Sequence, residues 1–333
     1  AHEVATVFMN TGSLRLAKPS MGSWVVYGLG TENQNLPGFI ALRGGRLPPG
    51  GATNYQAAFL PGVYQGASIN TQAPTVQQMI QNIRNPYINL GAREQERQIE
   101  FVKQLNEIQA RNLQRDAALE TRLESYEIAF KMQTEAPEVL DLSKESEATK
   151  KAYGLDNPQM ASYGLRCLMA RKLIENGVRF VQVFPGTGQP WDTHAKLKTD
   201  LPRICNKTDQ PTVALISDLK ARGLLDSTIV MWAGEFGRLP TTQNSDGRDH
   251  NRNAFSLFFA GGGFKQGLTY GETDDFGYKA TVNRVSVPNL QATMLHLLGL
   301  DHTKLTYPNG GRIETATDAT VTGAQIVKDL IRA

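Results

Sequence analysis

The strongest constraint on the fold is an alternation of helical and strand-like segments in the second half of the chain. The predicted strands cover residues 178–184 (VRFVQVF), 228–233 (TIVMWA) and 255–260 (FSLFFA), and the predicted helices cover 161–176, 208–222, 290–298 and the tail from 322. Because the strands are almost continuously apolar, the alternation indicates a parallel sheet that helices cover on both faces. The expected fold class is therefore α/β.

The first half of the chain predicts one buried strand and a long helical stretch. Residues 3–9 are compatible with a short helix, and residues 38–42 (GFIAL) indicate a strand. Apolar residues at helical spacing over 93–134 predict a long amphipathic helix or a helical pair, which Pro137 ends. We expect this stretch to be a packing element or a partner-facing arm without a catalytic role, within a helical insertion over residues 72–157.

Composition excludes several functional classes. The 333 residues carry 35 Lys and Arg against 32 Asp and Glu, and because the net charge of +3 comes without a basic run, we expect no nucleic-acid partner. No apolar run reaches the roughly 18 to 20 residues that a membrane-spanning helix needs. Cys167 and Cys205 lack the spacing of a disulfide framework, a zinc knuckle or a redox pair.

Charged side chains lie close to the predicted strands, at the edge where open parallel sheets bind ligands. Strand 178–184 is followed by Trp191-Asp192-Thr193-His194, and strand 228–233 by Gly234-Glu235-Phe236-Gly237-Arg238. Gly247-Arg248-Asp249-His250 comes just before strand 255–260. Three strand-associated loops therefore each carry a carboxylate, and two of them add a histidine.

Asp, Glu and His are the usual oxygen and nitrogen ligands of zinc, manganese and other divalent ions. The candidate ligands are Asp192, His194, Glu235, Asp249 and His250. Arg238 and Arg248 suit bidentate binding of the non-bridging oxygens of a tetrahedral anion. The set predicts a metal-and-anion site in which the metal polarises an ester and activates a nucleophile. Two structural interpretations stay open: Asp192 to His194 as a capped turn, and Glu235 as an ion-pair partner of Arg238.

Several motifs occur together along nearly the whole chain: MNTGS, PSMGSWVVYGLG, LPGFIAL, GVRFVQV, WDTH, GLLDSTIVMWAGEFGR, GRDHN and QATMLHLLGLDH. In combination they resemble the domain of unknown function 1501 family, which is grouped with the sulfatases in the alkaline phosphatase-like superfamily and is abundant in planctomycete bacteria. The resemblance implies an alkaline phosphatase-like α/β/α sandwich with a mostly parallel sheet. It also implies a site with one or two divalent metal ions, such as zinc, manganese or calcium, that hydrolyses phosphate or sulfate esters.

The resemblance assigns positions within the metal site. The segment VMWAGEFG resembles an apolar strand that ends in an Asp-His pair, so Glu235 stands at the aspartate ligand and Phe236, which cannot bind a metal, at the histidine. Asp249 is expected to supply the missing ligand. The remaining matches to metal ligands of the superfamily are Asp192, His194 and His250.

The resemblance also brings the first residues into the site. The sulfatase nucleophile lies nine positions before the Thr of a Thr-Gly pair, and the same count back from Thr11 reaches His2. His2 is thus expected at the nucleophile position or in the lining of the site, with a frayed terminal residue as the alternative. Such proteins also have a first strand with a metal-binding Asp, and we expect residues 1–333 to form a single domain that lacks this strand.

Two functions are consistent with these residues. The first is a metal-dependent hydrolase of sulfate or phosphate esters, with polysaccharide esters among the candidate substrates and with Arg238, Arg248 and His2 as candidate catalytic residues. Family members commonly carry export signals, which implies a periplasmic or secreted location. The alternative is a catalytically silent binding or assembly protein that self-associates through the helical insertion. Phe236 favours the silent protein, whereas the many charged groups at strand ends favour the enzyme, since burying them unpaired costs several kcal/mol.

Overall fold

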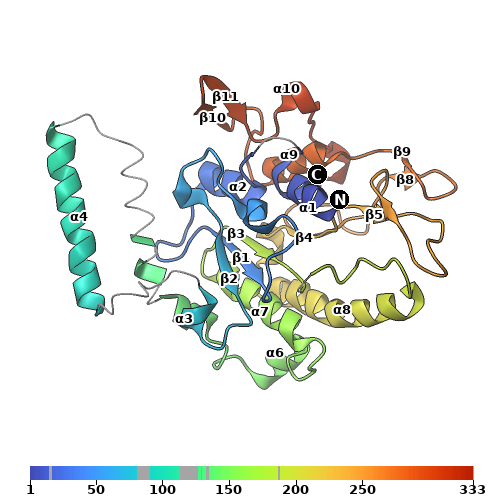
Figure 1. Cartoon of the computed structure of the whole chain (residues 1–333), viewed down its shortest axis with the longest axis horizontal. Coiled ribbons are helices and arrows are strands. Elements are labelled where there is room, and N and C mark those ends of the chain that lie inside the picture. Colours follow the sequence, from blue (N-terminus) through green and yellow to red (C-terminus); the bar gives the residue numbers. More distant parts are fainter. Residues whose placement is uncertain are drawn as a thin grey trace.

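Strand β1 (Phe39–Arg43) is the centre of a parallel three-stranded sheet, with β2 (Ala67–Asn70) on one side and β3 (Phe180–Val183) on the other. The computed structural model describes residues 1–14, 17–80, 91–112, 127–128, 130–132, 135–186 and 188–332. Over these residues the protein is mixed α/β, with this small parallel sheet and four antiparallel strand pairs (Figure 1).

Both faces of β1 are buried because helices cover the sheet on two sides (Figure 1). Phe39 packs toward helix α2 (Met21–Leu29), and its neighbour Ile40 packs toward helix α7 (Ala161–Glu175). Successive side chains of a strand point to opposite faces, so one apolar strand contributes to two core layers. The prediction of a covered parallel sheet is confirmed for the strands at residues 38–42 and 178–184.

Helix α2 has no clear signal in the sequence, since Pro19 and Gly22 are typical of a loop. Gly22 lies inside the helix and permits its close contact with the sheet. A Cβ atom at this position would lie 2.6 Å from the Phe39 ring and 2.8 Å from the Phe180 ring. Glycine has a low helix propensity, so local preference argues against a helix at this position. Close packing against the sheet explains why a glycine is nevertheless found there.

Strands β4 (Val230–Trp232) and β7 (Phe258–Ala260) pair with each other in antiparallel fashion, as a two-stranded sheet. Both segments were expected in the parallel sheet, and that prediction is wrong. Residues 233–257, which connect the two strands, contain no helix. Two parallel strands must be joined by a crossover segment, which is usually a helix, whereas two antiparallel strands need no crossover helix. A connection without a helix is therefore typical of the antiparallel pair.

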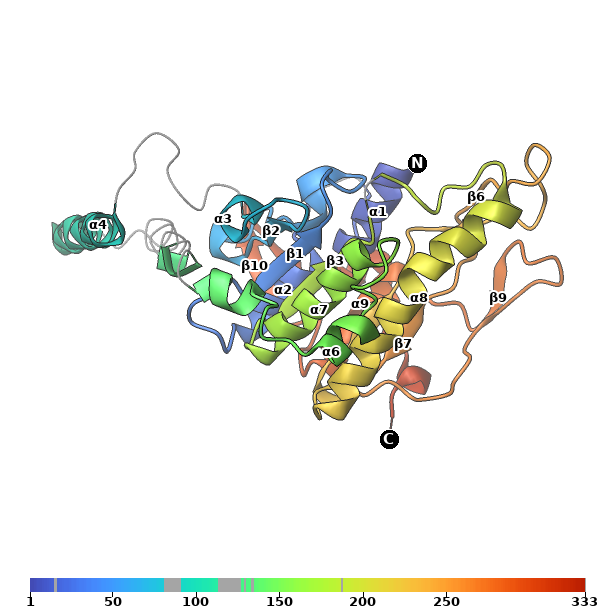
Figure 2. The same ribbon diagram turned by 90° about the horizontal axis from the view of Figure 1, so that it is seen from below.

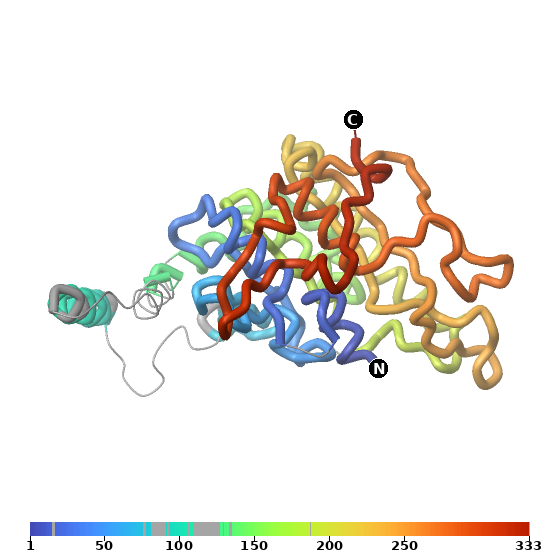
Figure 3. The backbone as a smooth tube through the Cα atoms, turned by 90° about the horizontal axis from the view of Figure 1, so that it is seen from above, coloured from blue at the N-terminus to red at the C-terminus, as the bar shows by residue number. Residues whose placement is uncertain are grey.

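Helix α1 (His2–Thr11) confirms the short helix expected over residues 3–9 and lies beside helix α9 (Val287–Leu297) (Figure 3). The Gln291 side chain of α9 donates a hydrogen bond of 3.1 Å to a backbone carbonyl of α1. Gln182 of β3 donates a 2.8 Å hydrogen bond to the side-chain oxygen of Asn10. These two contacts fix α1 against the sheet edge and α9.

Helix α8 (Leu197–Ala221) packs along α7 on one side of the molecule (Figure 2). The sequence pattern predicts only its second half, over residues 208–222. Pro202 lies inside the first half of the helix, and a proline normally ends or kinks a helix. This explains why the first half of α8 is not apparent from local preference.

Helix α4 (Ala92–Asn112) stands apart from the sheet (Figure 1) and confirms the helical character of that part of residues 93–134. Residues 113–126, 129, 133 and 134 of the predicted stretch lie outside the described residues. Further along the chain, Met132, Ala136 and Leu140 pack into the core on the α7 face of the sheet. The boundaries of the helical insertion, residues 72–157, stay a prediction.

The remaining described elements are short: α3 (Val76–Met79), α6 (Glu147–Ala152), β5 (Gly237–Arg238), β6 (His250–Asn251), β8 (Glu272–Thr273), β9 (Ala280–Val282), β10 (Thr306–Asn309), β11 (Arg312–Thr315), α10 (Ala319–Thr322), and the 3₁₀ helices η1 (Gly51–Tyr55), η2 (Gly62–Tyr64), η3 (Leu225–Ser227) and η4 (Lys328–Leu330). The predicted closing helix from residue 322 is wrong, because α10 ends at Gly323, which adopts a left-handed conformation with φ of 68°.

Candidate functional site

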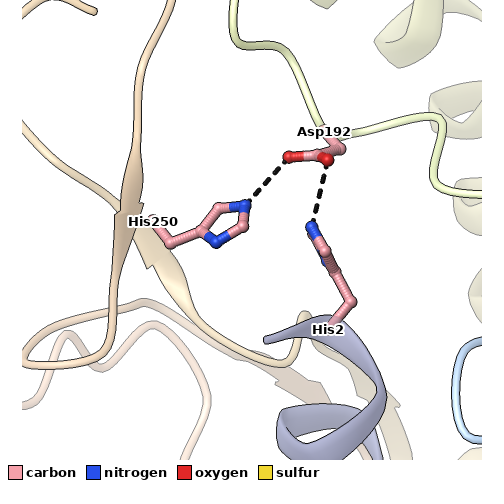
Figure 4. Close-up of side chains that lie close together, drawn as sticks. All are labelled: His2, Asp192 and His250. Atoms are coloured by element: carbon pink, nitrogen blue, oxygen red, sulfur yellow. Dashed lines mark hydrogen bonds and ion pairs between the residues drawn. The ribbon is translucent and has the colours of Figure 1, made fainter.

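The carboxylate of Asp192, in the loop after β3, is contacted by four side chains, of which one is in the same loop and three come from distant parts of the chain. Its Oδ1 lies 2.7 Å from Arg238 Nη1, 2.8 Å from His194 Nε2 and 3.1 Å from His250 Nε2. Its Oδ2 lies 3.0 Å from His2 Nε2. Figure 4 shows His2 and His250 approaching the carboxylate from two different elements. The structure therefore brings together residues that the sequence pattern proposed for one site.

The hairpin formed by β5 and β6 places two of these residues side by side. Arg238 of β5 lies directly opposite His250 of β6 in the antiparallel register. Residues opposite one another in such a pair have their side chains on the same face of the ladder. Arg238 Nη2 also donates a 3.3 Å hydrogen bond to the backbone carbonyl of Trp191, which ties the hairpin to the Asp192 loop.

The loop of His194 packs closely against the loop that leads to His250. Gly247 is buried there, and a Cβ atom at this position would lie 1.9 Å from the carbonyl oxygen of His194. The next residue, Arg248, donates its backbone N–H to the Thr193 carbonyl at 3.1 Å. A glycine is needed at position 247 because no side chain fits between the two backbones.

Replacing Gly247 by alanine is therefore expected to push the two loops apart and to displace His194 from Asp192. We expect at least a tenfold loss of divalent-metal affinity, about 1.4 kcal/mol of binding free energy. Isothermal titration with Zn²⁺ measures this change. Gly186→Ala is the matched control, since a Cβ atom there meets only Pro190 at 3.9 Å. Equal affinity in both variants would contradict the proposed role of the close approach.

The electrostatics of the site centre on Asp192. Burial alone would raise the pKa of this carboxyl, but hydrogen bonds from Arg238 and His250, together with the charge of Arg238, outweigh burial and hold the pKa at about 2. Asp192 is therefore an anion at neutral pH. An anionic carboxylate with several nitrogen atoms around it is a suitable ligand for a divalent cation.

Two of the histidines have their second ring nitrogen bound to an oxygen acceptor. Nδ1 of His2 lies 2.6 Å from Glu235 Oε1, and Nδ1 of His194 lies 2.5 Å from Gln243 Oε1. When such an oxygen accepts the Nδ1 proton, the Nε2 lone pair is left for a metal. Gln243 is a site residue that sequence reasoning missed, because an amide in a polar loop carries no ligand signal of its own.

The described residues contain two groups that fit a metal ion. His2, Asp192 and His250 form one group, and His194, Asp249 and His250 form the other. In each group the donor atoms lie within 4.8 Å of one another. The donor set is carboxylate oxygen and imidazole nitrogen, which suits zinc or another divalent transition metal. The side chains therefore fit the predicted cofactor class, and His250 is common to both groups.

A protein-family model described as "Protein of unknown function (DUF1501)" matches residues 1–331. The chain belongs to the DUF1501 family. Comparison with curated proteins and with solved structures gives no match. Among the described residues, no helix is both long and apolar enough to cross a membrane.

The two arginines predicted for the site of this DUF1501 member lie in different surroundings. Arg248 is adjacent to the site, but its guanidinium donates to the Gly247 carbonyl within its own loop, at 2.9 Å. Glu235 contacts His2, and Arg238 contacts Asp192. Among the described residues, Glu235 and Arg238 therefore do not form the ion pair of the alternative interpretation. Of the two arginines, Arg238 is the one whose guanidinium contacts the central carboxylate.

Phe236 occupies the position at which the resemblance predicts a histidine ligand. In the DUF1501 structure its ring lies 5.0 Å from that of His2 and 4.4 Å from that of His250, between centroids. The guanidinium carbon of Arg238 lies 5.8 Å from the same ring. Phe236 therefore forms an apolar wall of the cluster. Although it stands where a histidine ligand is expected, the donor atoms of His2 and His250 remain beside it.

Proposed function

We propose that this protein is a metal-dependent hydrolase of sulfate or phosphate esters. The observation that carries the proposal is the convergence of His2, His194, His250 and Arg238 on the two oxygens of Asp192. A purely structural ion pair needs only one cationic partner. A carboxylate with three imidazoles and a guanidinium combines metal ligands with an anion-binding group.

Arg238 supports an anionic, tetrahedral substrate. Its guanidinium is partly exposed and already bound to a carboxylate at 2.7 Å, which holds it in a fixed orientation. A planar guanidinium can bind two non-bridging oxygens of a sulfate or phosphate group at once. We assign Arg238 the task of orienting that group and offsetting the charge that develops on its oxygens.

Hydrolysis would proceed by attack of an oxygen nucleophile on sulfur or phosphorus, with loss of the alcohol. A divalent ion, when bound, supplies Lewis-acid polarisation of the ester and lowers the pKa of a bound water. His2, Asp192 and His250, or His194, Asp249 and His250, are the residues that would hold that ion. Arg238 fixes the substrate, and the Phe236 ring excludes water from one side of the cluster.

The finer features of the proposal rest on the resemblance to the sulfatases. They are an alkaline phosphatase-like sandwich fold, a planctomycete-type relationship, a periplasmic or secreted location, and ester groups on a polysaccharide as one candidate substrate. The covered parallel sheet, with Asp192 in the loop after an expected strand end, is consistent with that fold.

The decisive test is metal content together with ester hydrolysis. After dialysis against metal-free buffer, plasma mass spectrometry is expected to find one or two equivalents of a divalent metal per chain. A chelator should abolish hydrolysis of 4-nitrophenyl sulfate or phosphate, and added metal should restore it. A chain with no stoichiometric metal and no hydrolysis with any added divalent ion would exclude the hydrolase.

A second candidate, a catalytically silent assembly protein, is favoured by one observation. Helix α4 exposes apolar side chains along one stripe, with Phe101 61% and Leu105 48% accessible. If assembly is the function, Leu105→Glu should convert an oligomer to a monomer in analytical ultracentrifugation. A chain that is monomeric before substitution would exclude assembly through α4.

A further inference from the structure

We propose that His2 is a metal ligand through Nε2 and that Glu235 is the positioning residue that holds its ring. The inference rests on the metal of the proposed function and deepens it. It departs from the sequence-based expectation, in which His2 is the candidate nucleophile and Glu235 a direct ligand. The ligand set of this position is then His2, Asp192 and His250.

The first step concerns the protonation of the His2 ring. Nδ1 lies 2.6 Å from Glu235 Oε1, a distance typical of a strong, charge-assisted hydrogen bond. An ionised carboxylate can only accept, so Nδ1 carries the proton. In a neutral ring Nε2 is then an acceptor with a free lone pair. A carboxylate behind a histidine in this way is the usual outer partner of a metal-bound imidazole.

The second step concerns Nε2 itself. His2 is only 8% exposed, and within the described part of the chain its buried Nε2 has no hydrogen-bond partner. Asp192 Oδ2 lies 3.0 Å away as an ion-pair contact, and no hydrogen bond joins the two atoms. A buried polar atom without a partner costs roughly 1–3 kcal/mol. A cation between Nε2 and Oδ2 would satisfy both atoms.

The third step is the arrangement of the neighbouring donors (Figure 4). The His2 and His250 rings meet edge to face at 83°, with centroids 4.5 Å apart. Asp192 bridges them, because one of its oxygens contacts His250 and the other contacts His2. Three donors from helix α1, a loop and a hairpin therefore surround one position, and three protein ligands leave the fourth position of a tetrahedral metal open, as in catalytic zinc sites.

The same geometry argues against His2 as the nucleophile. A nucleophilic nitrogen must reach the sulfur or phosphorus of a substrate, whereas Nε2 of His2 exposes less than 1 Å² of surface. The Phe236 ring, 5.0 Å from the His2 ring, closes one side further. A metal ion needs much less space than an ester, so the burial of Nε2 suits a ligand.

The experiment is a Co²⁺ titration of the metal-free full chain, followed by visible d–d absorption. We expect His2→Ala to weaken Co²⁺ binding by more than 100-fold and to change the band shape, since a nitrogen ligand is lost. Glu235→Ala should weaken binding by about 10- to 100-fold, the usual effect of losing an outer partner. Glu235→Gln should recover most of this loss, because its amide oxygen still accepts the Nδ1 proton. His296→Ala, on the exposed part of α9, is the matched control.

The outcomes separate the two proposals. Absence of Co²⁺ binding by the unmodified chain overturns the proposed function and this inference together. Binding by the unmodified chain with an unchanged affinity and spectrum in His2→Ala overturns the inference alone. If His2→Ala does not fold, His2→Phe fills the same space without a donor atom, and normal Co²⁺ binding by that variant has the same meaning. Equal losses of Co²⁺ affinity in Glu235→Ala and Glu235→Gln would contradict the positioning role of Glu235.

Discussion

Replacing Asp192 by alanine is expected to lower kcat/KM for aryl ester hydrolysis by at least about 1,000-fold, or roughly 4 kcal/mol of transition-state stabilisation. Asp192 contacts His2, His194, His250 and Arg238, so in the proposed site its loss would remove a metal ligand and release the arginine assigned to orient the substrate. A metal used as a Lewis acid supplies several kcal/mol, which sets the expected size of the effect.

The measurement combines steady-state kinetics, metal content and thermal unfolding of the same preparation. The variant should bind the metal at least about tenfold more weakly, which corresponds to about 1.4 kcal/mol of binding free energy. Its secondary structure should persist, because Asp192 lies in a loop outside the apolar core. Asp226→Ala is the control, since that carboxylate is 80% exposed and remote from the cluster. Full metal content and activity in Asp192→Ala would contradict the assignment of the site.

Replacing Arg171 by methionine is expected to destabilise the fold by about 3–5 kcal/mol. Arg171 lies in α7 with its side chain 2% exposed, and it contacts three carboxylates. The distances are 2.8 Å to Glu145, 2.5 Å to Glu175 and 3.0 Å to Asp218. Burial would lower the pKa of Arg171, but hydrogen bonds to Glu145 and Glu175 raise it above its ordinary value. Without the guanidinium, the three carboxylates face one another without their shared cation.

Urea unfolding followed by circular dichroism measures this loss as a change in the free energy of unfolding. Arg203→Met is the matched control, because Arg203 pairs with Asp200 at the surface and is 55% exposed. Exposed ion pairs contribute roughly 0–1 kcal/mol, so the control should change little. A loss below 1 kcal/mol in Arg171→Met would mean that Arg222 and the other neighbours of these carboxylates compensate for the missing charge.

The clustering of the candidate site residues was more predictable from the sequence than the strand pairing was. Asp192, Glu235 and His250 were proposed because they follow or precede apolar strands, and they do lie within one cluster of contacts. That expectation assumed a parallel sheet, which binds ligands at the carboxyl ends of its strands. The antiparallel pairing of β4 and β7 instead places the start of β7 beside the end of β4.

The direction of β4 and β7 could not be obtained in the same way. An apolar segment such as residues 228–233 has the same pattern in a parallel sheet and in an antiparallel pair. Which strand pairs with β4 is decided by the segment that connects the two strands and by the space that the other helices and strands leave. Helix α2 and the first half of α8 were hidden for a related reason, because Gly22 and Pro202 oppose a helix locally. Packing against the sheet or against α7 overrides that preference.

Residue type and order alone predicted the α/β class, the strands at residues 38–42 and 178–184, and candidate metal-ligand side chains close to strand ends. Tertiary structure decided which ring nitrogen of His2 faces Asp192, that Gln243 holds His194, and that Arg238 rather than Arg248 contacts the carboxylate. Apolar patterning is a local, periodic property that a sequence carries along its length. The orientation of an imidazole or a guanidinium depends on hydrogen bonds between residues far apart in the chain, so it exists only once the chain is folded.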